Sequence, residues 1–177
     1  MSISKNKMQV EIWSDVMCPF CYIGKRKFEH ALAQFAEKKN IRVTWKSFQL
    51  SPDMKTDPSS NIHQYLAAHK GISLQEARQM NDQVTQMAAK EGLVYNFDTA
   101  VVANSFNAHR FVHFAKQHDR QGEAEESLFR AYFTDGRNID DQEELIHLGK
   151  EIGLDPAALR SALEYGSYAD DVRADIH

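Results

Sequence analysis

Two cysteines, Cys18 and Cys21, stand three residues apart, and they are the only cysteines in the 177-residue chain. The pair follows a strand-like run at residues 8–13 and opens a helix-like run, which places both sulfurs one turn apart on one face. Cys18 would then lie where unpaired backbone N–H groups and the helix dipole stabilise an anion. Because the thiolate is the reactive form of cysteine, and Cys21 can close a disulfide with Cys18, the spacing predicts thiol–disulfide exchange.

Composition excludes several other classes of function. The formal net charge is −4, with acidic and basic residues mixed along the chain, which argues against nucleic-acid or membrane partners. No apolar run approaches the ~18 residues of a membrane span, and the start of the chain lacks the apolar segment of a signal peptide. A secreted protein stabilised by disulfides would carry more cysteines, spread along the chain. We therefore expect a cytoplasmic protein.

The elements that position the cysteines read as strand, helix, strand. Residues 8–13 are strand-like, residues 19–39 are helical, and residues 41–48 alternate apolar and polar side chains. Pro19 suits the first helical turn, where its missing N–H costs nothing. The order predicts two parallel strands joined by a right-handed helical crossover.

Beyond Pro52 and Pro58 the pattern is almost entirely helical. Helix starts are indicated by a capping box at residues 73–76, by Asp140 with Glu143, and by the pair Asp155-Pro156. Further helices are expected at residues 102–118, 123–133 and 168–177. We divide the chain into residues 1–50 with the cysteine motif, a helical insertion at 51–165, and a helix at 166–177 that returns to the first part.

This layout resembles a thioredoxin fold whose first half is followed by the helical insertion of the DsbA family. The local residues resemble the FrnE-like branch of that family: Ser14-Asp15, the run Cys-Pro-Phe-Cys-Tyr-Ile-Gly-Lys at 18–25, Asn104, Ala-His-Arg at 108–110, and Ala-Tyr-Phe at 131–133 with Gly136. The resemblance implies an α/β, thioredoxin-like core with a large all-helical insertion. It also implies a dithiol–disulfide oxidoreductase in which Cys18 attacks and Cys21 resolves the mixed disulfide, without a cofactor. The substrate would be a thiol or disulfide protein or a small thiol, with glutathione or a reductase recycling the site.

The family continues past its insertion into a Val-Pro segment with a cis proline, a β-hairpin and a last helix. The four prolines here are Pro19, Pro52, Pro58 and Pro156, and none has that context. The resemblance therefore implies a chain that lacks the C-terminal hairpin and helix. Such a chain would have an unpaired strand edge, which favours pairing with a second copy and hence a homodimer.

Supporting roles are assigned to residues near the motif. Glu11 resembles the buried acid that relays the proton of the second cysteine in thioredoxin-like proteins; the alternative is an exposed strand glutamate. His109 and Arg110, with Asn104, either line a groove beside the cysteines or bond within the insertion. Phe20 stands where periplasmic DsbA proteins carry histidine, which implies a less oxidising pair.

Three alternatives remain. The kappa-class glutathione transferases and the 2-hydroxychromene-2-carboxylate isomerases share this layout, but they usually carry serine at the first motif position. A redox sensor or holdase would use the same thiols without turnover. A zinc site would need two ligands beyond the cysteines, for which His109 and His113 have helical spacing. The run Lys25-Arg26-Lys27 is interpreted as a solvated helix face.

Overall fold

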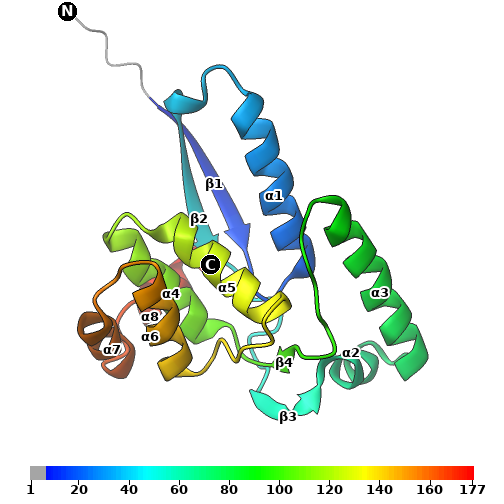
Figure 1. Cartoon of the computed structure of the whole chain (residues 1–177). Coiled ribbons are helices and arrows are strands. Elements are labelled where there is room, and N and C mark those ends of the chain that lie inside the picture. The colour runs from blue at the N-terminus through cyan, green and yellow to red at the C-terminus, as the bar shows by residue number, and fades with distance from the viewer. Residues whose placement is uncertain (1–6) are drawn as a thin grey trace, which may run out of the picture.

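The computed structural model describes residues 7–177; residues 1–6, part of the start that we interpret as lacking a signal peptide, lie outside the described residues. The chain begins with strand, helix and strand and continues with a mainly helical region (Figure 1). The elements in order are β1 (Met8–Ser14), α1 (Pro19–Gln34), a short 3-10 helix η1 (Lys38–Asn40), β2 (Ile41–Ser47), β3 (Asp57–Asn61), α2 (Ile62–Lys70), α3 (Leu74–Lys90), β4 (Val101–Val102), α4 (Phe106–Gln117), α5 (Gln121–Phe133), α6 (Gln142–Glu151), α7 (Pro156–Glu164) and α8 (Ala169–Ile176).

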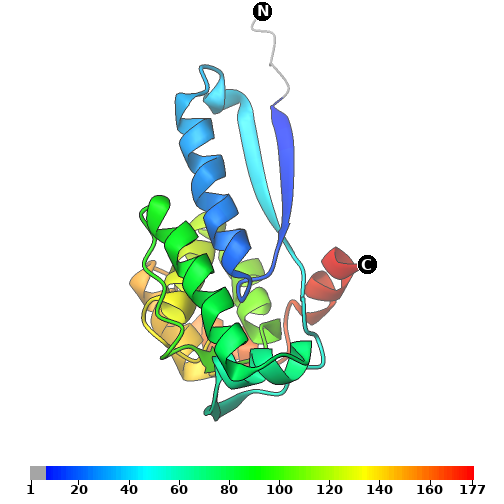
Figure 2. The ribbon, with the colours of Figure 1, turned by 90° about the vertical axis from the view of Figure 1, so that its right-hand side faces the viewer.

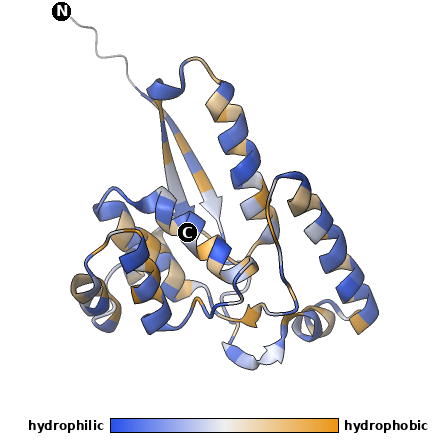
Figure 3. Ribbon diagram, in the orientation of Figure 1, coloured by the Kyte–Doolittle hydropathy of each residue, from blue (hydrophilic) through white to orange (hydrophobic). Residues whose placement is uncertain are grey.

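The strands β1 and β2 pair in parallel, from Met8 opposite Ile41 to Ser14 opposite Ser47, and α1 is the crossover between them. The predicted strand–helix–strand unit is therefore confirmed. Figures 1 and 2 show this unit rising from the helical body, which contacts the lower ends of β1 and β2. The body contacts more of α1, because Lys27 and His30 lie 3.7 and 3.8 Å from Glu91 at the end of α3. Hydrophobic and hydrophilic residues alternate along the strands (Figure 3). The cysteine motif lies at the lower end of α1, at the junction of the two parts.

The hydrophobic core fills the helical body and continues beneath the motif. The largest fully buried apolar side chains come mainly from α4 and α5: Phe111, Leu128, Phe129, Tyr132 and Phe133. Tyr22 of α1 joins them, since its ring stacks on that of Phe129 with centroids 4.7 Å apart and planes 4° apart. Aromatic stacking of this kind adds about 1 kcal/mol to the burial of the rings. The motif helix is thus held by the insertion.

Two local predictions need correction. Helix α1 ends at Gln34 instead of residue 39, because Phe35 leaves the helix in an extended conformation. The second concerns residues 57–61 and 101–102, for which the sequence predicts no strands. They form a small antiparallel sheet, in which β3 pairs with β4 at Asp57–Val102 and Asn61–Val101 with an irregular register. The sequence of β3, Asp-Pro-Ser-Ser-Asn, is polar and contains proline, so it carries no alternating apolar signal.

The helix starts follow the capping signals closely. Ser73 and Glu76 form the predicted capping box of α3, and Asp155 caps α7 ahead of Pro156. At α6 the cap is Asp141 instead of Asp140, with its carboxylate accepting hydrogen bonds from the backbone of the first turn. These residues satisfy N–H groups that have no partner inside the helix.

The outer edge of β2 is covered by side chains instead of a strand. The amide of Gln121 accepts a hydrogen bond from Trp45 N at 3.1 Å and donates one to Trp45 O at 2.9 Å. Asp175 of α8 accepts from Ser47 N at 3.0 Å and pairs with Lys46 at 2.8 Å. Helix α8 therefore packs along β2. The division of the chain into three parts remains a prediction. No helix among residues 7–177 is long and apolar enough to cross a bilayer.

Candidate active site at the start of α1

Cys18 is the N-cap of α1, and Pro19 follows it in the first helical turn. The Cys18 N–H donates to Asp15 O at 2.9 Å, while Cys18 O accepts from Cys21 N at 3.0 Å. Both thiols are free and half-buried, and Cys21 packs against the hydrophobic core. Phe20 lies between them and is 55% exposed. The motif therefore presents two neighbouring thiols at a helix N-terminus, as predicted from their spacing.

The two thiols share a proton. The hydrogen bond from Cys18 lowers the pKa of Cys21 to about 6, against the opposing effect of burial. The same hydrogen bond, together with burial and the charge on Cys21, raises the pKa of Cys18, although the backbone N–H groups of Cys21 and Phe20 favour its thiolate. The first ionisation belongs to the pair, which holds one proton and one negative charge at neutral pH. Such a pair is reactive, because the thiolate is the nucleophile.

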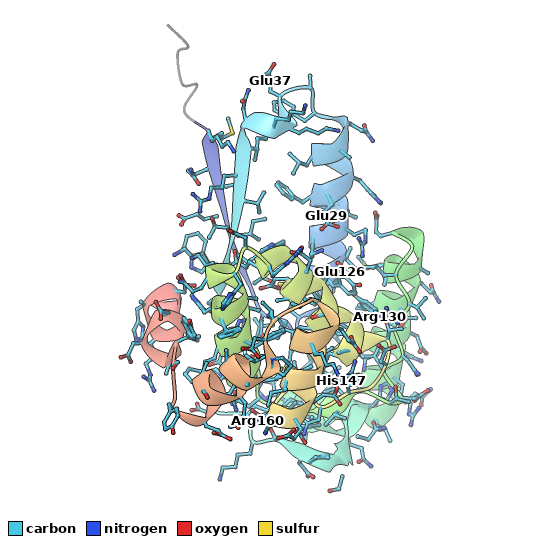
Figure 4. The ribbon with its side chains drawn as sticks, turned by 60° about the vertical axis from the view of Figure 1, so that its left-hand side comes forward. Glu29, Glu37, Glu126, Arg130, His147 and Arg160 are labelled. Carbon is cyan, nitrogen blue, oxygen red and sulfur yellow. The ribbon has the colours of Figure 1, made fainter. Side chains whose placement is uncertain are left out.

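The insertion holds the motif through polar contacts as well as packing. The hydroxyl of Tyr95 donates to Pro19 O at 2.6 Å, and that of Tyr22 donates to Glu126 at 2.7 Å. Lys25 bridges Glu29 of α1, at 2.6 Å, and Glu126 of α5, two residues labelled in Figure 4. The side chain of Lys25 is only 4% exposed. The interpretation of this lysine as part of a solvated face is therefore wrong.

Asp15 and His109 form a second buried polar group beside the motif. Asp15 accepts hydrogen bonds from Met17 N at 3.1 Å and Leu50 N at 2.8 Å, so it ties the loop before α1 to the segment after β2. His109 Nε2 lies 3.6 Å from Asp15 Oδ1. Burial raises the pKa of Asp15, but His109 and the two N–H groups outweigh it and hold the pKa below its ordinary value. His109 thus lies next to the residue that shapes the motif loop.

Arg110 points away from the cysteines. Its guanidinium donates to Ser167 O at 2.9 Å, to Ala162 O at 2.9 Å and to Leu163 O at 2.7 Å. These carbonyls belong to the end of α7 and the turn after it, where backbone oxygens have no helical partner. Arg110 is therefore a helix-capping residue within the insertion, which favours the second of the two roles that we considered for it.

Asn104 also bonds within the fold. Its amide donates to Pro52 O at 3.0 Å and Met54 O at 2.8 Å, and its oxygen accepts from Gln49 at 3.1 Å. These contacts fix the loop that follows β2. That loop reaches the motif at Leu50, whose N–H donates to Asp15.

Glu11 does not have the position expected of a buried acid. Its side chain is 50% exposed, and its carboxylate lies 3.7 Å from Lys46 on the neighbouring strand. Side chains alternate along a strand, so the extra residue between Glu11 and the motif turns it to the opposite face from Ser14, which is buried. The alternative, an exposed strand glutamate, describes its place correctly.

A buried acid does lie near the cysteines, but it comes from the insertion. Glu125 of α5 is 1% exposed, and its Oε2 has no hydrogen-bond partner among the described residues. Burial raises the pKa of Glu125 to about 8; the charge of Lys25 opposes this, and the charges of Cys21 and Asp15 add to it. Sequence analysis missed this residue. Its signal was the helical spacing to Leu128, Phe129 and Tyr132, which puts a glutamate in an apolar stripe.

A cavity of about 160 Å³ opens beside the motif. Met17 and Pro19 line it on the motif side, and Tyr65, Phe97 and Tyr132 line it on the insertion side. Its walls are largely apolar and it lies between the two parts of the molecule, as ligand pockets often do. Among residues 7–177, no cluster of three or more His, Cys, Asp or Glu side chains is arranged to hold a metal ion.

Comparison with known proteins gives one family. A family model described as the DSBA-like thioredoxin domain matches residues 9–177. The uncharacterized Bacillus subtilis protein YwbO is 32% identical over 168 residues, which cover 92% of this chain and 75% of that protein.

Solved structures agree. The probable DsbA oxidoreductase SCO1869 of Streptomyces coelicolor is 37% identical, with a TM-score of 0.88 over 96% of this chain and 73% of that one. The cytosolic disulfide reductase DsbM of Pseudomonas aeruginosa is 17% identical, with a TM-score of 0.67 over 95% of this chain and 74% of that one, a likeness that shows the fold alone. These matches confirm the predicted fold class, a thioredoxin-like α/β core with a helical insertion.

Proposed function

The chain belongs to the family of DSBA-like thioredoxin domains, and from this premise we propose that it is a dithiol–disulfide oxidoreductase acting through Cys18 and Cys21. One observation carries the proposal: two free, half-buried thiols lie side by side at a helix start, where the hydrogen bond from Cys18 lowers the pKa of Cys21 to about 6. Ser14-Asp15 and the run at residues 18–25 support membership of the FrnE-like branch.

The exchange needs only these two sulfurs and a substrate. In the reducing direction, the proton between the two sulfurs moves from Cys18 to Cys21. Cys18 then attacks a substrate disulfide as the thiolate, forms a mixed disulfide and releases one substrate thiolate. Cys21 then loses its proton and attacks the Cys18 sulfur, which closes the Cys18–Cys21 disulfide and releases the second substrate thiolate. Two electrons pass from the pair to the substrate. The packing of Cys21 against the hydrophobic core suits the resolving role.

The surroundings of the pair support the remaining parts of the proposal. The cavity beside Pro19 offers an apolar recess for the group attached to the substrate sulfur. Glutathione or a reductase would return the pair to the dithiol state. We propose a cytoplasmic location, because both cysteines belong to the reactive pair and none is left for a structural disulfide. A homodimer stays a prediction.

The test compares turnover of the wild-type protein with that of Cys18→Ser and Cys21→Ser in an insulin-reduction assay with glutathione as electron donor. We expect turnover by the wild type, none by Cys18→Ser, and accumulation of mixed disulfides by Cys21→Ser. A wild-type protein that neither reduces insulin nor oxidises a dithiol peptide would refute the proposal. Conjugation of glutathione to an electrophile, unaffected by Cys21→Ser, would favour the transferase alternative, and disulfide-dependent binding without turnover would favour the sensor.

A further inference from the structure

Glu125 is a buried acid that the disulfide-exchange scheme leaves without a role. It sits in the first half of α5, on the same face as Phe129, which is one turn further along the helix. Phe129 stacks on Tyr22, the residue directly after Cys21. The face of α5 that carries Glu125 therefore packs against the first turns of α1.

The opposing face of α1 carries Cys21 and Lys25. These residues are four apart, so they lie on one side of the helix. Both act on Glu125 electrostatically, and both point into the junction between α1 and the insertion. Glu125 thus lies opposite Cys21, whose charge changes with the redox state, and Lys25, whose ammonium group stays charged.

We propose that Glu125 takes up a proton when the Cys18–Cys21 disulfide is reduced and releases it when the disulfide forms, so that the buried charge of the site stays constant. This inference rests on the proposed function. In the oxidised protein the sulfurs are neutral, and Glu125 carries the negative charge. In the reduced protein the pair carries one negative charge, and Glu125 is neutral.

Protons and electrons balance in this scheme. Reduction by a substrate dithiol delivers two electrons and two protons and leaves a substrate disulfide. One proton is held between the two sulfurs, whose first ionisation has a pKa of about 6 and is therefore mostly complete at pH 7. The second goes to Glu125 instead of to solvent. Lys25 already pairs with Glu29 and Glu126. In both redox states the pair and Glu125 together then hold one negative charge, which avoids the cost of burying a second one beside it.

The electrostatics of the reduced protein support the proposal. Burial is the largest cause that raises the pKa of Glu125 to about 8, and the charge on Cys21 adds to it. When the disulfide forms, the contribution of Cys21 is lost and the pKa of Glu125 falls, because a like charge has been removed. Protonation of Glu125 and reduction of the pair are therefore linked, and each favours the other.

The neighbouring Glu126 accepts a hydrogen bond from Tyr22 and pairs with Lys25 and Arg26 of α1. The remaining titratable groups around α5 are paired away from Glu125. From α4, His109 faces Asp15 and His113 lies 3.1 Å from Asp175. From β2, Lys46 pairs with Asp175 and Glu11, and from α6, Glu144 pairs with Arg137. Asp15, just before α1, is the further charge that raises the pKa of Glu125. Since the pKa of Asp15 is held low, its charge is constant through neutral pH and does not produce the linkage.

The experiment measures the equilibrium of the pair with glutathione buffers from pH 5 to pH 9, in the wild type, in Glu125→Gln and in the control Glu123→Gln. Glu123 lies on the same helix, is 48% exposed and pairs with Arg120. Glu125 has a lower pKa in the oxidised protein than in the reduced protein. Between these two pKa values, the ratio of the wild-type reduction constant to that of Glu125→Gln should fall by up to tenfold for each unit that the pH rises. This corresponds to a difference in reduction potential of about 30 mV per pH unit. The Glu123→Gln control should follow the wild type.

A second measurement does not depend on the variant. The infrared difference spectrum of the wild type, reduced minus oxidised at pH 7, should show the C=O stretch of a newly protonated carboxyl group, and Glu125→Gln should lack it. Parallel pH curves for the wild type and Glu125→Gln, or a wild-type spectrum without this band, would overturn the inference. Neither result would affect the proposed function, which fails only if the pair does not exchange with thiols at all.

Discussion

The sharing of a proton between Cys18 and Cys21 predicts a specific effect of Cys21→Ala. In the reduced wild type the first ionisation has a pKa of about 6. Without its partner sulfur, Cys18 should titrate near or above the ordinary cysteine value of ~8.5. The thiolate fraction at pH 7 then falls from about 90% to about 3%, roughly 30-fold. The ultraviolet absorbance of the thiolate, followed against pH, measures both fractions directly.

Reaction rates should change less than these fractions, and in both directions. A thiolate of higher pKa is a better nucleophile, by about tenfold for this difference in pKa. With an aromatic disulfide reagent, Cys21→Ala should react about threefold more slowly than the wild type at pH 7 and about tenfold faster at pH 9. A reduced wild-type pair whose first ionisation falls at pH 8 or above would show that the sulfurs do not share a proton. The same reasoning would be refuted if one of the two proteins reacted faster than the other at both pH 7 and pH 9.

Three further substitutions test individual residues. Phe20→His places an imidazole beside the Cys18 thiolate, so it should lower the pKa of Cys18 and make the pair more oxidising; an unchanged thiolate titration and potential would remove Phe20 from the account. Glu11→Gln should leave the rate of mixed-disulfide resolution unchanged in rapid-quench trapping, because Glu11 is half exposed; slower resolution would contradict its placement. Arg110→Met should lower the free energy of unfolding in urea by about 3 kcal/mol, since three carbonyls lose a charged donor, yet leave thiol reactivity per folded molecule unchanged. The exposed Arg130→Met is its control, and a change in thiol reactivity would place Arg110 nearer the site than the structure does.

The sequence was sufficient wherever a local rule determines structure. The parallel β1–α1–β2 unit, the place of the cysteines at a helix start and the caps of α3 and α7 follow from short patterns of residue types. The small sheet of β3 and β4 did not follow, because it depends on contacts between residues 57–61 and 101–102, which are far apart in the chain. Propensity alone cannot reveal such a pairing.

The acid near Cys21 shows a different limit. Glu11 was the candidate because it precedes the motif in the chain, whereas Glu125 lies more than a hundred residues away. Among the acidic residues at 123–126, only the packing of α5 on α1 separates the buried Glu125 from the half-exposed Glu126. The same packing buries Lys25, although the sequence indicates that the basic run at residues 25–27 faces solvent. Burial of single charged residues is a tertiary property, and helical spacing only marks the positions where it can occur.

The side chains of Gln121 and Asp175 leave the sheet only one edge at which a further strand can pair. Because they occupy the backbone groups of Trp45 and Ser47, a further strand cannot pair with that part of β2. Within residues 7–177, β1 pairs only with β2, so its other edge is the one that can accept a strand. A strand bound there would end beside Ser14, four residues before Cys18. Any chain that extends this sheet, including a second copy, would therefore place part of its backbone next to the loop that carries the cysteines.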